Sequence, residues 1–180
     1  MRPVAWRPAA IFRKPRRMTL VIAAEGVLIT LLAYYLGSRF TAIFHGPSAE
    51  VGGVWSVISG LVVLQSTIRE TLKSSLLRSI GTFIGALIAG LYLTLFGFGM
   101  VGMALCAGLT LAICYLVDIF EYARLAAATV VIIAALSQSS PGVPPFLNAF
   151  LRFVESSIGI GVCILSVYSM RVFVRRNAPT

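Results

Sequence analysis

The sequence is poor in charged residues, and above all in acidic ones. Of its 180 residues 15 are basic and only six are acidic, so 12% are charged, about half the share of an ordinary soluble domain. Apolar residues make up 58% of the chain, and the mean hydropathy is +0.93. A soluble domain of this length could not bury so much apolar surface. The composition therefore predicts an integral membrane protein.

Residues that carry common enzyme chemistry are also scarce. The single histidine, His45, lies in a Gly-Pro loop, and neither lysine follows a Gly-x-x-x-x-Gly frame. The cysteines are odd in number and fall inside apolar runs: Cys106, Cys114 and Cys163. This pattern excludes a zinc site, a disulfide framework, a serine–histidine pair and a nucleotide-phosphate loop. The sequence therefore predicts neither a cofactor nor an enzyme.

What the sequence has in abundance is apolar runs, which glycine, proline or charged residues separate. There are six, over residues 18–36, 52–66, 79–96, 100–117, 123–136 and 146–170. Inside a bilayer each backbone polar group needs a partner within its own segment, so these runs should be transmembrane helices. The predicted organisation is a basic N-terminal segment at 1–17, a six-helix domain at 18–170 and a short basic tail at 171–180. Six spans leave no room for a separate soluble domain.

The basic residues predict the orientation of the chain. Thirteen of the 15 fall on one side of the predicted membrane, six of them in residues 1–17, and only Arg39 and Arg152 fall on the other. By the positive-inside rule both termini should be cytoplasmic. The net charge of +9 could suggest binding to nucleic acid, but this distribution of basic residues argues against it. Trp55, near the start of the second run, is expected in the outer aromatic belt.

Small residues spaced four apart mark several predicted spans. Such stripes let helix backbones approach closely in lipid. Close packing is one interpretation, and glycines that line a path or act as hinges are the other. The glycines concerned are Gly52, Gly60, Gly81, Gly85, Gly108 and Gly159.

A weak internal repeat spans half of the chain. The segment 77–80, with Gly85 after it, resembles the segment 151–154 with Gly159 after it, at an offset of 74 residues or about three spans. A three-plus-three inverted repeat, a recurring transporter design, would explain the match. Chance similarity of a few common residues is the alternative.

Charged residues at membrane depth are candidates for function, because they are costly there. Arg152 and Glu155 share one face of the sixth span, and Glu25 lies inside the first. The pair is either an ion pair that anchors the helix, or an anion-attracting arginine beside a proton-exchanging glutamate. Glu25 is either the partner of a neighbouring arginine or a proton-coupling carboxylate.

The sequence resembles the fusaric acid resistance / aromatic acid exporter family. The resemblance is carried by residues 55–66, which open on Trp55, and by Arg78-x-x-Gly81-Thr-x-x-Gly85. The runs 121–123 and 152–159 also fit the family pattern. It implies an inner-membrane protein of Gram-negative type, in which this chain is a single six-helix half.

The family resemblance implies efflux of aromatic or amphipathic organic acids. The chain should act as a homo-oligomer in membrane lipid, often with a periplasmic adaptor and an outer-membrane channel. In this hypothesis Arg152 and Arg78 attract the small organic anion, Glu25 and Glu155 carry protons, and the proton motive force supplies the energy. A structural or assembly subunit and a passive channel are the alternatives.

Overall fold

The computed structural model describes residues 16–139 and 142–176, and this part of the chain folds into six α-helices without strands. The basic segment predicted at 1–17 lies almost wholly outside the described residues. The helices are α1 (Arg16–Phe44), α2 (Ala49–Val63), α3 (Ile68–Phe96), α4 (Met100–Leu116), α5 (Phe120–Ser139) and α6 (Pro145–Arg176), with a short 3-10 helix η2 (Gly46–Ser48) before α2. The predicted all-α fold with six helices is confirmed.

Three of the helices are long and apolar enough to cross a bilayer by themselves. These stretches are Thr19–Phe44 in α1, Ile68–Phe96 in α3 and Pro145–Val172 in α6, while Met100–Leu116 and Tyr122–Gln138 are shorter apolar helices. Helix α2, with 15 residues, is about 22 Å long and packs within the bundle between α1 and α6.

The distribution of side chains is the reverse of that in a soluble protein. Leu116 is 84% exposed, whereas Arg152 is 1% exposed and is the largest of the fully buried side chains. Leucines on α3 and α4, such as Leu95 and Leu105, also point outward. An apolar exterior around a polar interior suits lipid as the surrounding solvent.

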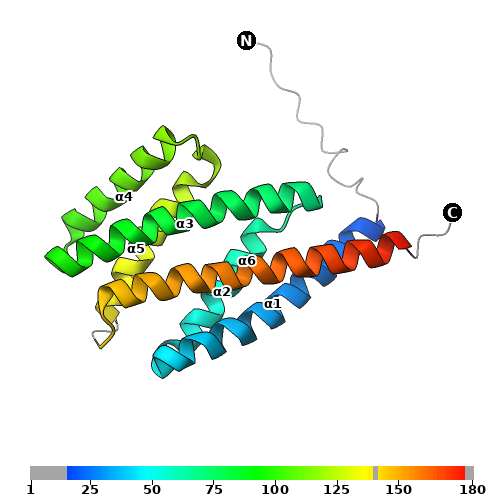
Figure 1. Ribbon diagram of the computed structural model, residues 1–180, viewed down its shortest axis with the longest axis horizontal. Helices are drawn as coiled ribbons and strands as arrows, with labels where there is room; N and C mark the ends of the chain where they lie inside the picture. The colour runs from blue at the N-terminus through cyan, green and yellow to red at the C-terminus, as the bar shows by residue number, and fades with distance from the viewer. Residues whose placement is uncertain (1–15, 140–141, 177–180) are drawn as a thin grey trace, which may run out of the picture.

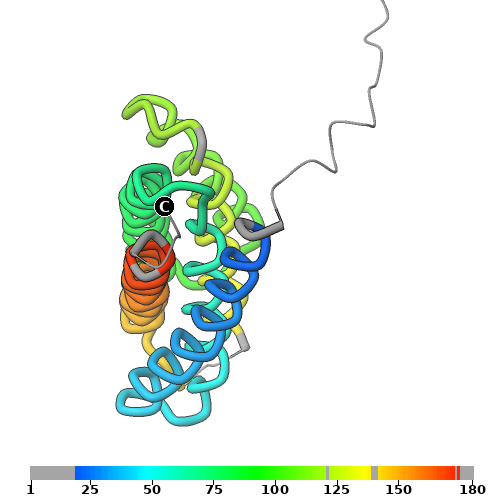
Figure 2. The backbone as a smooth tube through the Cα atoms, turned by 90° about the vertical axis from the view of Figure 1, so that its right-hand side faces the viewer, coloured from blue at the N-terminus to red at the C-terminus, as the bar shows by residue number. Residues whose placement is uncertain are grey.

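The helices form two groups of three that run in opposite directions. Helices α3 and α6 lie antiparallel at the centre (Figure 1), and α2 packs on α6 while α5 packs on α3. Helix α1 then covers α2, and α4 covers α5. Figure 2 shows α3 and α6 end-on as one layer, with α2 and α5 beside them. Exchanging the first three helices for the last three leaves this pattern of contacts unchanged.

Two glycines at corresponding positions make the closest approaches to the backbone carbonyl of a neighbouring helix. A Cβ atom at Gly159 of α6 would overlap the carbonyl of Ser56 on α2. A Cβ at Gly85 of α3 would lie 2.5 Å from the carbonyl oxygen of Ala126 on α5. Gly85 and Gly159 are 74 residues apart, the offset of the internal sequence repeat. The structure therefore supports the three-plus-three interpretation.

The other candidate glycines differ in their surroundings. A Cβ at Gly60 would lie 2.8 Å from the Gly159 carbonyl oxygen, and one at Gly52 would lie 2.7 Å from Glu155 Oε1. At Gly81 the nearest atom, the Cβ of Ala126, would be at an ordinary 3.4 Å.

Gly108 does not pack against another helix among the described residues of this copy of the chain, so its role in helix packing stays a prediction. It is exposed, and no atom lies within 4 Å of a Cβ built there. Helix α4 buries a different stripe with the same spacing, two residues away: Gly102, Cys106, Thr110 and Cys114. The spacing alone indicates that a face is lined by small residues but not which neighbour it meets.

Three helices extend more than three residues beyond one end of their apolar runs. Helix α3 starts at Ile68, well before residue 79, because Thr67 and Glu70 form a capping box. The Thr67 hydroxyl accepts from the Glu70 amide at 3.2 Å and donates to Glu70 Oε2 at 2.9 Å. Helix α1 continues past residue 36 to Phe44, and α6 past residue 170 to Arg176.

We predict that Gly159→Ala destabilises the bundle. The methyl group would have to displace the Ser56 carbonyl, and overpacking of this kind costs about 1–3 kcal/mol. Urea unfolding of the detergent-solubilised protein, followed by circular dichroism, measures the loss. Gly161→Ala, on the same helix with no atom within 4 Å, is the matched control and should be neutral or slightly stabilising. Equal stabilities of the two variants would contradict close α2–α6 packing.

Candidate functional site

Three charged side chains are buried in the core that α2, α3 and α6 form. Arg78 comes from α3, and Arg152 and Glu155 come from α6. None of the three residues is more than 2% exposed. Charged groups are rarely buried to this degree unless they are paired or functional.

Glu155 is held by partners from two helices. Its Oε2 lies 2.9 Å from Arg152 Nη1, in the i, i+3 pair that the sequence predicts. Its Oε1 accepts a 2.5 Å hydrogen bond from the Thr41 hydroxyl of α1. The missing side chain at Gly52 gives both groups room. The carboxylate therefore links α1 to α6 and neutralises one guanidinium.

Trp55 of α2 connects the two arginines. Its indole Nε1–H donates a 2.9 Å hydrogen bond to the backbone carbonyl of Arg152. Its ring centroid lies 5.8 Å from Arg78 Cζ, within the range of a cation–π contact. The hydroxyl of Ser56 next to it donates to the Glu155 carbonyl at 2.9 Å. Trp55 is buried, so its expected place in the outer aromatic belt is wrong.

Among the described residues no carboxylate pairs with Arg78. Its Nε and Nη1 atoms are buried and find no hydrogen-bond partner in that part of the chain. The same holds for Arg152 Nε, and for four hydroxyls on the same three helices: Ser59, Ser75, Thr82 and Ser156. Arg78, Arg152 and Glu155 together carry one net positive charge. A buried excess of donors and positive charge suits an anionic ligand.

Glu25 lies apart from this centre and is bound by another arginine. Arg171 Nε and Nη2 reach Glu25 Oε1 and Oε2 at 2.8 and 2.9 Å, and Nη2 also donates to the Gln65 carbonyl at 2.7 Å. Glu25 is fully buried, and the Arg171 side chain is 12% exposed. This contact ties α1, α6 and the link after α2 together. The geometry favours the ion-pair interpretation of Glu25.

A polar cavity opens near the start of α3. It has a volume of about 300 Å³ and is lined by Gln65, Glu70, Lys73, Ser74 and Tyr122. The hydroxyls of Ser74 and Tyr122 are hydrogen-bonded to each other. Ser74 lies one helical turn before Arg78, on the same side of α3.

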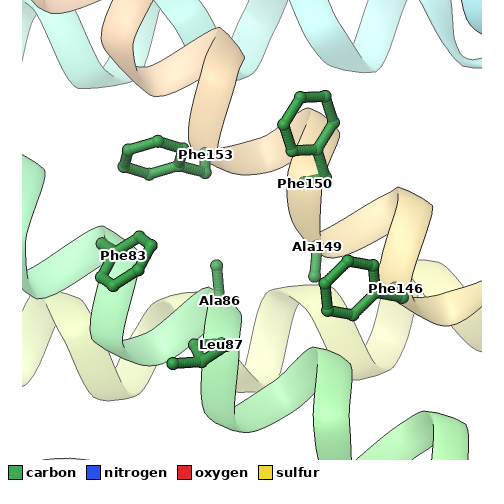
Figure 3. A pocket seen from close by; sticks show the side chains of 7 residues that line it. All are labelled: Phe83, Ala86, Leu87, Phe146, Ala149, Phe150 and Phe153. Carbon is green, nitrogen blue, oxygen red and sulfur yellow. The ribbon is translucent and has the colours of Figure 1, made fainter.

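A second hollow between α3 and α6 is apolar. It measures about 80 Å³, and Figure 3 shows phenyl rings of both helices around it. Phe83 and Phe153 meet there edge to face, with ring centroids 5.4 Å apart. None of its lining side chains can hydrogen-bond a carboxylate, so it is not the anion site. Among the described residues no group of three His, Cys, Asp or Glu side chains could hold a metal ion.

Sequence reasoning missed four residues of these centres: Thr41, Trp55 in its buried role, Ser56 and Arg171. Thr41 and Arg171 lie beyond the ends of the apolar runs, and their partners are 114 and 146 residues away in the sequence. Ser56 was visible only as a member of a small-residue stripe. Helical spacing could have placed Thr41 on the face of α1 that carries the buried Gly37 and Ala33.

The family profile described as "Fusaric acid resistance protein-like" matches residues 28–166, which include both central arginines and Glu155. The chain belongs to this family. Fusaric acid resistance-like proteins are associated with membrane transport, and the apolar helices agree with a membrane location.

A curated relative of this fusaric acid resistance-like chain is a UPF0421 protein of Oceanobacillus iheyensis. The two are 28% identical over 112 residues, which is 62% of this chain and 31% of the relative. The chain thus matches about a third of the relative's length. No solved structure matches it.

We predict that Arg171→Ala strongly destabilises the protein. The substitution leaves the Glu25 carboxylate buried without its cation, and breaking a buried pair in this way costs roughly 3–5 kcal/mol. Urea unfolding in detergent measures it, with Arg124→Ala as an exposed basic control near the same end. Combining Arg171→Ala with Glu25→Gln should recover part of the loss. If it does not, the pair is not the source of the effect.

Proposed function

We propose that this chain is an inner-membrane transporter subunit that exports aromatic or amphipathic organic acids. The observation that carries the proposal is the buried positive excess of the central site. The guanidinium of Arg78 lies in the core, with two nitrogens unpartnered among the described residues. A carboxylate could accept a charge-assisted hydrogen bond from such a nitrogen. The membrane-transport association of the family supports the same class of function.

The two arginines have different tasks in this proposal. Arg78 binds the carboxylate of the organic anion, and the indole of Trp55 offers an apolar surface beside it for a ring or a chain. Arg152 is held by Glu155 in the described conformation and acts as a second anion site when Glu155 is neutral. The anion then moves from Arg78 to Arg152, past Trp55, which contacts the guanidinium of Arg78 and the backbone carbonyl of Arg152.

Glu155 is the proton carrier of the proposed cycle. Protonation of its carboxylate would cancel the attraction to Arg152 and free that guanidinium for an anion. In this cycle the proton reaches Glu155 from the periplasm and leaves to the cytoplasm. Its departure restores the Arg152–Glu155 pair and displaces the anion toward the periplasm, so the inward flow of protons drives export. We assign Glu25 a structural role beside Arg171 rather than the proton-carrying role that the sequence suggested.

The proposed orientation places both termini in the cytoplasm. Helix α1 begins and α6 ends at the same end of the bundle (Figure 1). Basic residues gather at the helix ends found there, namely Arg69, Lys73, Arg124 and Arg171. We also propose that the chain works in lipid as a homo-oligomer, with a periplasmic adaptor and an outer-membrane channel as partners.

In proteoliposomes that hold the full chain, we expect radiolabelled benzoate to move when a pH gradient is imposed. Arg78→Gln should lower the initial rate about tenfold or more, because it removes charge-assisted hydrogen bonds worth about 1.5–3 kcal/mol. Arg39→Gln, an exposed arginine on α1, is the matched control and should transport normally. No gradient-driven flux of benzoate or of an amphipathic acid would contradict the proposal.

Glu155→Gln should separate transport from its driving force. The neutral amide mimics the protonated carboxyl, so benzoate should still equilibrate but no longer accumulate against its gradient when a pH difference is applied. The measurement is the ratio of internal to external benzoate at steady state. Undiminished accumulation would remove Glu155 from proton coupling. Gradient-independent flux in the unmodified protein would instead indicate a passive channel.

A further inference from the structure

The cavity near the start of α3 is the one polar hollow described above, and one of its lining residues, Ser74, lies one helical turn before Arg78. Gln65, Glu70 and Lys73 lie around it, at the end of the bundle that carries the start of α1 and the end of α6. Its remaining lining residues are Ser74 and Tyr122, both buried. The two hydroxyls that bond to each other therefore line the inner part of an otherwise polar and open space.

Beyond this hydrogen bond α3 presents a row of buried polar groups without partners in the described part of the chain. Ser75, Arg78 and Thr82 follow at spacings of three and four, so they share one face of the helix. Ser74 to Arg78 is one turn, about 6 Å along the axis. Two hydroxyls thus lie between an open polar cavity and a buried guanidinium.

We propose that this cavity is the access site through which an organic carboxylate reaches Arg78, and that the Ser74–Tyr122 hydrogen bond closes the path between them. The inference rests on the proposed function and adds to it the residues at which the anion first binds. Breaking one hydroxyl–hydroxyl contact exposes two donors to the arriving carboxylate. The guanidinium one turn further supplies the charge that draws the anion inward. Tyr122 comes from α5 and Ser74 from α3, so a small separation of these helices opens the path.

The test measures access to a cysteine placed behind the hydrogen bond, which requires no transport. Ser75→Cys is nearly isosteric at a buried position, and the parent protein, whose three native cysteines are buried, provides the blank. The full chain in detergent micelles is labelled with the anionic reagent MTSES and with the cationic reagent MTSET. Total labelling in SDS gives the reference for complete reaction.

Adding Tyr122→Phe to Ser75→Cys should raise the MTSES labelling rate about fivefold, the shift in open population expected when one hydrogen bond is lost. Ser74→Ala should do the same, since it removes the other partner of the same bond. Ser79→Ala, whose hydroxyl bonds only to the Ser75 carbonyl of its own helix, is the matched control and should leave the rate unchanged. If Tyr122→Phe impairs folding, as judged by circular dichroism, Ser74→Ala carries the test.

The charge of the reagent tests the path toward Arg78. In the opened variants MTSES should react faster than MTSET, and Arg78→Gln should abolish that preference. Unchanged labelling in both opened variants would overturn the closing contact, and an equal or greater rate for MTSET would overturn an anion path. A protein that shows the expected labelling but no benzoate flux would refute the proposed transport while leaving the access site standing.

Discussion

The centre of the bundle buries two arginines, Arg78 and Arg152, but only Arg152 has a carboxylate partner, Glu155, and the arrangement of the bundle follows from that constraint. A guanidinium in a lipid-surrounded core needs a negatively charged or electron-rich partner. For Arg152 this partner is the Glu155 carboxylate of the same helix, and for Arg78 it is the aromatic face of Trp55. To bring these groups together, α2 must approach α6 at backbone distance, which the glycines at 60 and 159 permit. The remaining helices cover this centre with apolar side chains. The same helix packing therefore buries the polar side chains and leaves the apolar side chains exposed.

The ion pair of Arg171 with Glu25 has a different role. Arg171 holds Glu25 with two nitrogens and also reaches the Gln65 carbonyl, so it joins two long helices and the link after α2. This contact is electrically balanced, whereas the central site is not. The difference separates a charged cluster that stabilises the fold from one that is left able to bind a ligand.

The sequence predicted the number and class of the helices and one ion pair within a helix. Apolar runs located all six helices, and the i, i+3 spacing predicted the pairing of Arg152 with Glu155. Helix ends were less accurate wherever charged residues continue a helix beyond its apolar run, as in the first turns of α3. The capping box at Thr67 was readable from the sequence and marks the true start.

Contacts between distant segments could not be read from the sequence. Nothing local to Thr41 indicates Glu155 as its partner, and the stripe around Gly108 has the same spacing as stripes that do pack. The spacing of small residues defines one face of a helix, but which helix packs against that face depends on the packing of all six helices.

The two triplets of helices correspond in packing but not in chemistry. Counting back 74 residues, Arg152 corresponds to Arg78, but Glu155 corresponds to Gly81. One triplet thus carries a compensated arginine and the other an uncompensated one. If the bundle were inverted in the bilayer, the arrangement of its helices would be unchanged, but the paired and the unpaired arginine would exchange places. The helix packing is therefore symmetric across the membrane, whereas the distribution of buried charge is not.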